Sequence, residues 1–405
     1  MTRRLCFHKN ALRCSIDLPS SKSISNRLLL IRALSRDKFD IRGLSGSDDT
    51  RVLEEGLQTP SETVDIGHAG TSMRFLTAYF AATGQAKIVT GSDRMKERPI
   101  SELVDALNQL GADIQYAGQK GYPPVLTSGK PLSGSSVRIS GNVSSQFISA
   151  LLMIAPTLPN GLTVHITDDT VSSSYIRMTL NLMLQAGVKA EWKDRKIIVP
   201  PQQYRSSGFT CERDWSAASY WYETVALADD AEILLKNLSE ESIQGDAVVA
   251  RIFNELGVET CYLPEGALLK KYPKQTSRFL FDFLNVPDIA QTMAVTLCLK
   301  NIPFRFSGIK TLKIKETDRI AALRNELLKL GFSIEENRQG VIEWDGKYTI
   351  PQNDISIATY HDHRMAMAFA PAAIVFPGIR IEDAEVVTKS YPNFWNDLKS
   401  AGFDS

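Results

Sequence analysis

The segment Leu103–Tyr116, LVDALNQLGADIQY, joins an apolar helix-like run to a glycine and a short alternating stretch. Glycine suits the left-handed position that ends a helix, and alternating residues suit a strand. The segment therefore predicts a helix, a cap and a strand in succession. Related segments begin at Leu180, Ala250, Leu323 and Phe394, and the glycines of all the copies are Gly111, Gly187, Gly257, Gly331 and Gly402.

A second set of helix-like segments alternates with the first and is apolar on nearly all sides. Such helices belong inside a domain, whereas helices with a charged face cover its outside. The apolar segments begin at Asn26, Thr71, Ser144, Trp215, Asp288 and His363. The two sets predict six β-α-β-α-β-β units of roughly 70 residues. The short interval before Thr71 indicates that the first unit has lost about a third of its length, with Gly56 as its expected helix cap.

Six units divide into two domains of three, and the usual size of domains also favours two in a chain of 405 residues. The expected fold class is α/β (α+β), with two similar domains, buried inner helices and an active site in the interdomain cleft. We expect residues 1–19 and 214–405 to form a discontinuous domain, and residues 20–213 to form the inserted one. The alternative is that Leu-Gly-Ala-like helix ends recur by chance.

Composition excludes several classes of protein. The 46 Lys and Arg residues balance 46 Asp and Glu residues, so no overall charge favours nucleic acid or an anionic membrane. The five cysteines are scattered and never spaced as CxxC, which argues against disulfides or a thiolate zinc site and favours a cytoplasmic location. The sequence shows neither a secretion signal nor an apolar run of about 18 residues, so we expect no membrane insertion.

Polar and basic residues gather at the starts of the expected inner helices. Free N–H groups and the helix dipole attract anions there, although a serine alone could simply cap the helix. Basic side chains oppose the dipole, so they indicate an external phosphate or carboxylate. The residues are Ser21, Lys22, Ser23, Arg27, Gly70, Thr71, Arg74, Ser144, Ser145, Gln146, Ser216, Asp288, Asp362, His363 and Arg364.

Two further segments carry candidate residues. The basic segment Asp93–Ile100, DRMKERPI, is either a solvated turn or an arginine clamp for phosphate or carboxylate. The segment Lys315–Arg319, KETDR, begins an outer helix. Its Glu316 and Arg319 could form only a surface ion pair, but together with Asp288 they form a possible acid/base set.

The histidines do not indicate a metal site. His361 and His363 flank Asp362, but a metal ion would need further ligands at fixed spacing, and the remaining histidines do not supply them. The glycine motifs of nucleotide-binding loops are missing as well. We therefore expect no metal.

At these motifs the sequence closely resembles the 3-phosphoshikimate 1-carboxyvinyltransferase (EPSP synthase) family. The matching segments follow the family's order from Leu18 to Trp395: LPSSKSISNR, AGTSMRFL, RMKERPI, SGNVSSQFISALLM, VPDIAQT, KIKETDR, DHRMAMAFA and TKSYPNFW. The resemblance implies two domains of three units, similar to the repeat found above. It also implies that the 5-hydroxyl of shikimate 3-phosphate adds to C2 of phosphoenolpyruvate, that C3 gains a proton, and that the tetrahedral intermediate then loses phosphate, without a cofactor.

The matched motifs imply roles for individual residues. Asp288 accepts the hydroxyl proton, Glu316 serves proton transfer at C3, and Lys22 stabilises the reacting region. His363 and Lys389 assist the departure of phosphate. Shikimate 3-phosphate is expected at Lys22, Ser23, Arg27, Ser144, Ser145, Gln146, Ser172, Tyr175, Asp288 and Lys315. Phosphoenolpyruvate is expected at Lys22, Gly70, Arg98, Gln146, Arg319, Arg364 and Lys389.

The sequence departs from the family pattern at several positions. His68 stands where the family usually has Asn, Phe75 where Pro is common, and Thr311 where Asn is frequent, which leaves herbicide sensitivity open. The shortened first unit implies a missing strand and loop beside the phosphoenolpyruvate end, and we expect a lower affinity for this substrate. We further expect a monomer whose two domains close on the substrates.

Two alternative functions remain open. The UDP-N-acetylglucosamine enolpyruvyl transferase shares the fold, but it typically carries a Lys-Asn pair near its start, whereas Ser23 follows Lys22 here. It also carries a mobile-loop cysteine, and no cysteine lies between Cys14 and Cys211. The second alternative is a catalytically impaired anion-binding homologue. Binding alone would require the cations but not two carboxylates, which repel anionic ligands.

Overall fold

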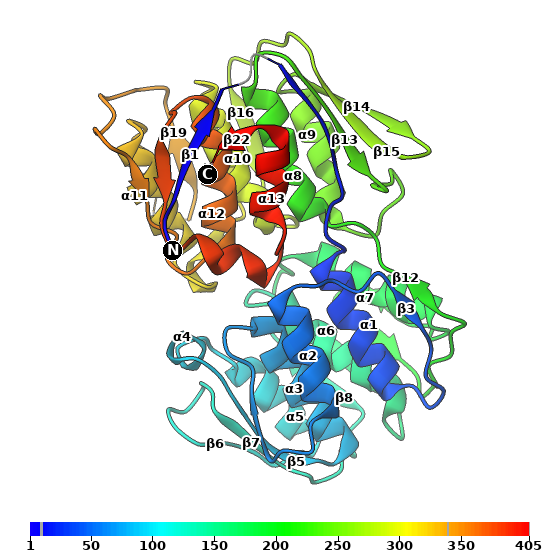
Figure 1. Cartoon of the computed structure of the whole chain (residues 1–405). Coiled ribbons are helices and arrows are strands. Elements are labelled where there is room, and N and C mark those ends of the chain that lie inside the picture. Colours follow the sequence, from blue (N-terminus) through cyan, green and yellow to red (C-terminus); the bar gives the residue numbers. More distant parts are fainter. Residues whose placement is uncertain (9–10, 338–339, 405) are drawn as a thin grey trace. The chain divides into compact units, whose positions relative to one another are not determined.

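The computed structural model describes residues 1–8, 11–337 and 340–404, and the chain divides into two compact units (Figure 1). Unit 1 consists of Met1–Ser20 and Glu212–Ser405, and unit 2 consists of Ser21–Cys211. Each unit combines small β-sheets with helices packed against them, so the predicted mixed α/β fold is confirmed. Within the described ranges, no helix combines the length and the apolar character that crossing a membrane requires.

Unit 1 repeats one sheet pattern, in which a parallel pair of strands is extended on one side by two antiparallel strands. The first sheet contains β2 (Leu12–Ile16), β13 (Ala231–Lys236), β15 (Gly266–Lys271) and β14 (Val258–Leu263). The second contains β16 (Phe279–Asp282), β17 (Phe304–Ser307), β19 (Ile342–Trp344) and β18 (Glu335–Glu336). The third contains β20 (Ser356–Ile357), β21 (Ile379–Ile381), β1 (Arg3–Phe7) and β22 (Phe403–Asp404), and thus joins both ends of the chain (Figure 1).

Unit 2 contains the same pattern in two sheets and a reduced version in another. One complete sheet contains β4 (Thr63–Asp65), β5 (Ala86–Thr90), β7 (Val125–Ser128) and β6 (Ile114–Tyr116). The other contains β8 (Ser136–Ile139), β9 (Leu162–Ile166), β11 (Lys196–Val199) and β10 (Glu191–Lys193). The reduced sheet is the parallel pair β3 (Ile41–Arg42) and β12 (Phe209–Thr210). The predicted shortening of the first unit therefore corresponds to the absence, within residues 21–211, of its antiparallel hairpin.

Two sets of helices accompany the sheets. The inner helices are α8 (Trp215–Leu227), α10 (Ala290–Leu299) and α12 (His363–Phe369) in unit 1, and α1 (Lys22–Leu34), α3 (Gly70–Thr83) and α6 (Ser145–Ile154) in unit 2. They are buried along most of their length, as their apolar sequences predict. The outer helices are α9 (Val249–Asn254), α11 (Arg319–Lys329) and α13 (Phe394–Ala401) in unit 1, and α2 (Asp48–Gln58), α5 (Ser101–Gln109) and α7 (Ser173–Gln185) in unit 2.

Short helical segments complete the two units. They are α4 (Asp93–Lys96) and the 3₁₀ helices η1 (Ala155–Thr157), η2 (Gly245–Val248), η3 (Pro287–Ile289), η4 (Lys310–Ile314), η5 (Ala370–Ile374) and η6 (Ala384–Lys389). Two of them carry candidate residues: η3 contains Asp288, and η6 ends with Lys389. Short helices therefore hold part of the predicted site.

The predicted cap glycines follow the outer helices. Gly111, Gly187, Gly257, Gly331 and Gly402 all have φ between 80° and 101°. This left-handed backbone is unfavourable for residues with a Cβ atom, so glycine ends each helix and lets the chain turn into the next strand. The predicted succession of helix, cap and strand is confirmed.

Two local predictions are wrong. Gly56 does not cap a helix, because it lies inside α2, which ends at Gln58. A Cβ atom at Gly56 would lie 2.6 Å from Leu76 Cδ1 of α3, so this glycine allows two helices to approach closely. Helix α1 begins at Lys22 and not at Asn26, which places Arg27 in the second turn of the helix, away from its free N–H groups.

Candidate active site

A group of charged side chains in unit 1, here called the charge cluster, comes from four segments. Asp288 lies in η3, before α10, and Glu316 lies in the loop between η4 and α11. Arg319 is the first residue of α11. Asp362 and Arg364 lie at the start of α12, and Lys389 ends η6. The cluster thus contains three carboxylates and three cations, whose formal charges balance.

Arg319 is the centre of the charge cluster, and its side chain is only 2% exposed. Its Nε atom lies 2.6 Å from Asp362 Oδ2, and Nη2 lies 2.9 Å from Glu316 Oε2. Its Nη1 atom lies 3.3 Å from Asp288 Oδ1. Burial alone lowers the pKa of Arg319, but the surrounding carboxylates raise it above its ordinary value. Arg319 therefore stays charged and fixes three carboxylates around one guanidinium.

The two candidate proton-transfer carboxylates each have a second cation. Arg364 Nη2 donates to Asp288 Oδ2 over 2.9 Å, and Lys389 Nζ donates to Glu316 Oε1 over 3.1 Å. Charge-assisted hydrogen bonds of this kind favour the ionised carboxylate. Asp288 and Glu316 are therefore each bound by two cations.

Asp362 and Asp318 explain why the local chain folds as it does. Asp318 caps α11 by accepting hydrogen bonds from the N–H groups of Ile320 and Ala321, and Asp362 caps α12 by accepting one from the N–H of Arg364. Asp362 is fully buried and also binds Arg319. One side chain thus starts a helix and holds the central arginine.

His363 and Lys315 lie beside the charge cluster. The His363 imidazole is buried, with Nδ1 at 3.8 Å from Asp362 Oδ1, a distance too long for a hydrogen bond. Lys315 is half-buried and directly precedes Glu316. Among the described residues, no group of three or more His, Cys, Asp or Glu side chains is arranged to hold a metal ion.

In unit 2, Lys22 begins α1 and forms an ion pair. Its Nζ atom lies 3.0 Å from Asp49 Oδ2, and Asp49 is almost fully buried in the first turn of α2. Ser72 of α3 donates to the backbone carbonyl of Asp49 over 3.2 Å, so the starts of three helices meet at this residue. The sequence did not reveal Asp49, because an acidic residue in the first turn of a helix is common and favourable.

Arg27 binds protein groups in this structure. Its guanidinium donates to Thr179 Oγ1 over 2.7 Å, to Ser149 Oγ over 3.3 Å and to the carbonyl of Ser23 over 2.9 Å. Burial lowers the pKa of Arg27 to about 10, and Tyr175 partly opposes this shift. Arg27 thus links α1 to α6 and α7, which gives it a structural role beside any contact with a ligand.

Gly70 and Arg98 are direct neighbours. A Cβ atom at Gly70 would lie 2.4 Å from Arg98 Nη1, so glycine is required here to admit the guanidinium. Arg98 is only 7% exposed, and its Nε atom has no hydrogen-bond partner in the described part of the chain. Arg74 donates to the carbonyls of Gly70 and Pro99 and therefore ties α3 to the Arg98 segment.

The serines at the start of α6 are placed as the sequence predicts. Ser144 caps the helix by accepting a hydrogen bond from the N–H of Gln146 over 3.3 Å. The Gln146 amide donates to Thr71 Oγ1 over 3.2 Å and joins the starts of α6 and α3. Ser172 adopts a left-handed backbone immediately before α7, and Tyr175 lies in the first turn of that helix. The tyrosine ring packs 5.8 Å from the Arg27 guanidinium.

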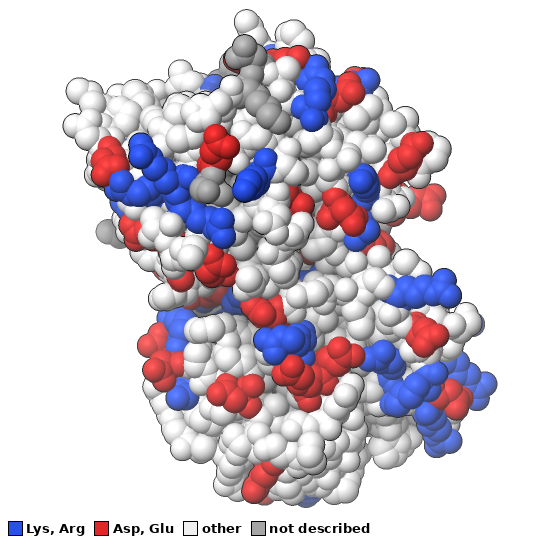
Figure 2. Space-filling view, in the orientation of Figure 1, with Lys and Arg blue, Asp and Glu red and all other residues white. Residues whose placement is uncertain are grey.

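The structure therefore brings the predicted residues together as two groups, one in each unit. The unit 1 group is the charge cluster with His363 and Lys315, and the unit 2 group lies at the starts of α1, α3, α6 and α7. Figure 2 shows basic and acidic side chains on the visible face of both units. The prediction that the site lies in an interdomain cleft stays a prediction.

The fold is that of the enolpyruvyl transferases. The structure matches EPSP synthase from Acinetobacter baumannii with a TM-score of 0.77 at 20% identity, covering 99% of each chain. It matches the enolpyruvyl transferase NikO from Streptomyces tendae with a TM-score of 0.74 at 14% identity, covering 100% of this chain and 98% of that chain. At these identities the likeness establishes the fold alone.

Sequence comparison then defines the family. The profile of EPSP synthase (3-phosphoshikimate 1-carboxyvinyltransferase) matches residues 53–398. A 3-phosphoshikimate 1-carboxyvinyltransferase of Bacteroides fragilis (strain YCH46) is 49% identical, over 99% of this chain and 98% of the relative. One from Pseudoalteromonas translucida (strain TAC 125) is 35% identical, over 95% of this chain and 96% of the relative. The chain belongs to the EPSP synthase family, and the resemblance found in its motifs is confirmed.

Proposed function

We propose that the protein transfers the enolpyruvyl group of phosphoenolpyruvate to the 5-hydroxyl of shikimate 3-phosphate and releases phosphate, a step of chorismate and aromatic amino acid biosynthesis. Family membership supports the substrates and the reaction class. The single structural observation that carries the proposal is the pairing of two carboxylates, Asp288 and Glu316, with one buried arginine, Arg319. A protein that only binds anions has no use for these carboxylates.

The addition step needs a base at the attacking hydroxyl. Asp288 is paired with the cations of Arg319 and Arg364. A carboxylate fixed in this way can accept the 5-hydroxyl proton as the oxygen attacks C2 of phosphoenolpyruvate. We therefore assign the base to Asp288.

The same step needs an acid at C3, and Glu316 is paired with Arg319 and Lys389. Phosphoenolpyruvate carries a phosphate and a carboxylate, which compete for the cations of the charge cluster. Bound phosphoenolpyruvate adds negative charge beside Glu316, which favours the protonated form of this carboxyl group. Substrate binding thus prepares Glu316 to deliver a proton to C3. Lys389 and His363 then stand beside the departing phosphate.

The unit 2 group supplies anion-binding and hydroxyl-binding groups. For shikimate 3-phosphate we propose Lys22, Ser23, Arg27, Ser144, Ser145, Gln146, Ser172 and Tyr175, together with Asp288 and Lys315 of unit 1. For phosphoenolpyruvate we propose Lys22, Gly70, Arg98 and Gln146, together with Arg319, Arg364 and Lys389. The buried Arg98 guanidinium against Gly70 and the capped start of α6 support this assignment.

We also propose that the two units are the two domains of three repeats, working as a monomer in the cytoplasm. The repeated sheet pattern of each unit supports the first part. Support for a reducing compartment comes from the scattered cysteines, which form no disulfide within the described residues.

The test is to incubate the purified protein with shikimate 3-phosphate and phosphoenolpyruvate without added metal, and to follow phosphate release and the mass of the product. Phosphate release should require both substrates and should disappear in Asp288→Asn, while the exposed control Asp229→Asn keeps full activity. Replacing shikimate 3-phosphate by UDP-N-acetylglucosamine should abolish turnover. Saturable binding of both substrates without turnover would instead identify an impaired homologue.

A further inference from the structure

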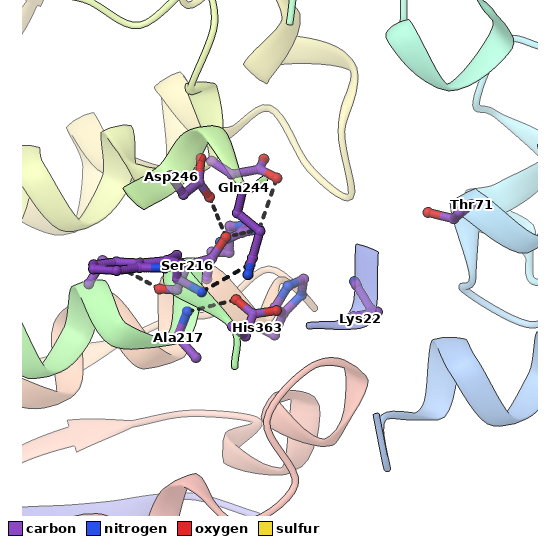
Figure 3. A network of polar contacts seen from close by, with 12 residues as sticks. Lys22, Thr71, Ser216, Ala217, Gln244, Asp246 and His363 are labelled. Atoms are coloured by element: carbon purple, nitrogen blue, oxygen red, sulfur yellow. Dashed lines mark hydrogen bonds and ion pairs between the residues drawn. The ribbon is translucent and has the colours of Figure 1, made fainter. Parts of the chain in front are cut away.

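A buried carboxylate that no sequence motif marked lies beside the charge cluster. Asp246 belongs to η2, and its side chain is directed toward Ser216, the second residue of α8 (Figure 3). Asp246 is only 5% exposed. Burying a carboxylate is costly unless it is hydrogen-bonded, so its contacts call for an explanation.

The segment that carries Asp246 is tied firmly to the start of α8. The Gln244 side chain accepts a hydrogen bond from the N–H of Trp215 over 3.1 Å and donates to the carbonyl of Arg213 over 2.7 Å. Gln244 also donates to Glu212 over 2.9 Å, and the N–H of Ile243 donates to the same carboxylate over 3.2 Å. The position of Asp246 relative to α8 is therefore well defined.

A chain of hydrogen bonds leads from Asp246 to Asp288. The Ser216 hydroxyl donates to Asp246 Oδ2. Arg364 Nη2 donates to Ser216 Oγ over 3.5 Å and to Asp288 Oδ2 over 2.9 Å. Because a hydroxyl has a single proton, its donation to Asp246 turns the Ser216 lone pairs toward Arg364. The Arg364 guanidinium thus contacts Asp288 directly and Asp246 through Ser216.

We infer that Asp246 is a positioning residue for the proposed base: through Ser216 it orients Arg364, and its charge sets the basicity of Asp288. The inference rests on the proposed function, since it assigns the base role to Asp288. It adds a group that is not among the ligand-binding residues named above.

The groups around Asp246 allow its carboxyl group to change its charge near neutral pH. Asp288, Arg364 and the α8 cap Asp214 face it, and α9, which also packs against η2, carries the exposed Arg251. Burial raises the pKa of Asp246 to about 7, with a further increase from Asp288, while Ser216 and Arg364 oppose the shift. Two neighbouring carboxyls titrate as a pair, and the raised pKa of Asp246 places the ionisation of this group near neutral pH.

Ionisation of Asp246 changes the affinity of Asp288 for a proton. When Asp246 loses its proton, a second negative charge stands beside Asp288 and raises its affinity for a proton. A stronger base removes the 5-hydroxyl proton faster. The kcat of the wild-type protein should therefore rise by about three- to tenfold as the pH increases through 7.

The decisive experiment compares the pH profiles of kcat for the wild-type protein, Asp246→Asn and the exposed control Glu240→Gln, each with saturating substrates. Asn keeps an acceptor for Ser216 but cannot ionise, so Asp246→Asn should lack the rise near pH 7 while its KM for phosphoenolpyruvate stays unchanged. The ratio of the two profiles removes the titration of the substrates themselves. A ratio that is flat from pH 5.5 to 8.5 would overturn the inference.

Ser216→Ala and Asp246→Ala separate positioning from charge. Both remove the support of Arg364, so KM for phosphoenolpyruvate should rise about tenfold, the equivalent of one charge-assisted hydrogen bond. Asp246→Asn should restore the wild-type KM. An equal KM in all variants would contradict the positioning role.

The pH dependence of thermal stability reports on the carboxyl without any substrate. The unfolded chain releases this proton near the ordinary value of 3.8, whereas the folded chain retains it up to about 7. The contribution of Asp246 is therefore fully present below pH 4 and lost as the pH rises through 7, so the Tm of wild type should fall relative to Asp246→Asn over this range. A constant difference in Tm would contradict the ionisation of Asp246 near pH 7.

A wild-type protein without turnover would overturn the proposed function and the base role together, whereas turnover with identical wild-type and Asp246→Asn pH profiles would overturn only the inference.

Discussion

The two units hold their cations in different ways. In unit 1, Arg319, Arg364 and Lys389 are paired with carboxylates inside one balanced cluster. In unit 2, Arg27 and Arg74 donate mainly to hydroxyl and carbonyl groups. The two arginines of unit 2 thus join helices through neutral groups, whereas the unit 1 cations hold the carboxylates that proton transfer requires. Lys22 of unit 2, in contrast, is paired with the Asp49 carboxylate.

The largest expected effect concerns the base in the unit 1 cluster. Asp288→Asn keeps the shape of the side chain but removes its proton affinity. We expect kcat to fall by about 10²–10⁴-fold, the usual contribution of a general base. Phosphate release under saturating substrates measures it. A loss smaller than tenfold would mean that another group takes the proton.

The second prediction compares two buried arginines. Arg319→Met leaves three carboxylates, one of them fully buried, without their central cation, and should cost about 3–5 kcal/mol. Arg27→Met leaves neutral hydroxyl and carbonyl groups and should cost about 1–3 kcal/mol. Urea unfolding of both variants measures the two losses. Equal losses would show that the two units do not differ in this respect.

The third prediction concerns the Arg98 guanidinium in unit 2. In Gly70→Ala the new methyl group would lie where Arg98 Nη1 now packs, so the guanidinium must move. We expect KM for phosphoenolpyruvate to rise about tenfold or more, because a charge-assisted hydrogen bond is displaced. Stability should change little, since alanine is favourable in a helix. Steady-state kinetics measure this KM, and an unchanged value would argue against Arg98 as a ligand of phosphoenolpyruvate.

The smallest expected effect is on stability and compares two glycines. Gly111 allows a left-handed backbone, and Gly56 allows two helices to pack closely. Gly111→Ala places a Cβ atom on a backbone with φ of 98° and should cost about 1–3 kcal/mol. Gly56→Ala meets Leu76 at 2.6 Å, but the gain in helix propensity offsets part of that strain, leaving about 1 kcal/mol. Denaturant midpoints of the two variants test this order. A larger loss for Gly56→Ala would show that helix packing dominates.

The sequence predicted the candidate residues better than their partners. Lys22 and Arg364 were found because basic residues at helix starts oppose the helix dipole, and Arg319 was found through the KIKETDR motif of the family. Asp49 was missed because an acid in a first helical turn is ordinary, and Asp246 was missed because η2 follows no periodic pattern. Arg27 was interpreted as a cation at a helix start, whereas it lies one turn further on and links three helices.

The sequence by itself determined the repeated unit, its cap glycines, its buried helices and the family, because periodicity, left-handed caps and motif order are properties of local sequence. The tertiary structure decided which charges meet. Arg319 pairs with Asp288 and Asp362 although these residues lie 31 and 43 positions away in the chain. Such pairs depend on how sheets and helices pack around a shared core, and the free energy of a buried charge depends on those distances, which no local pattern records.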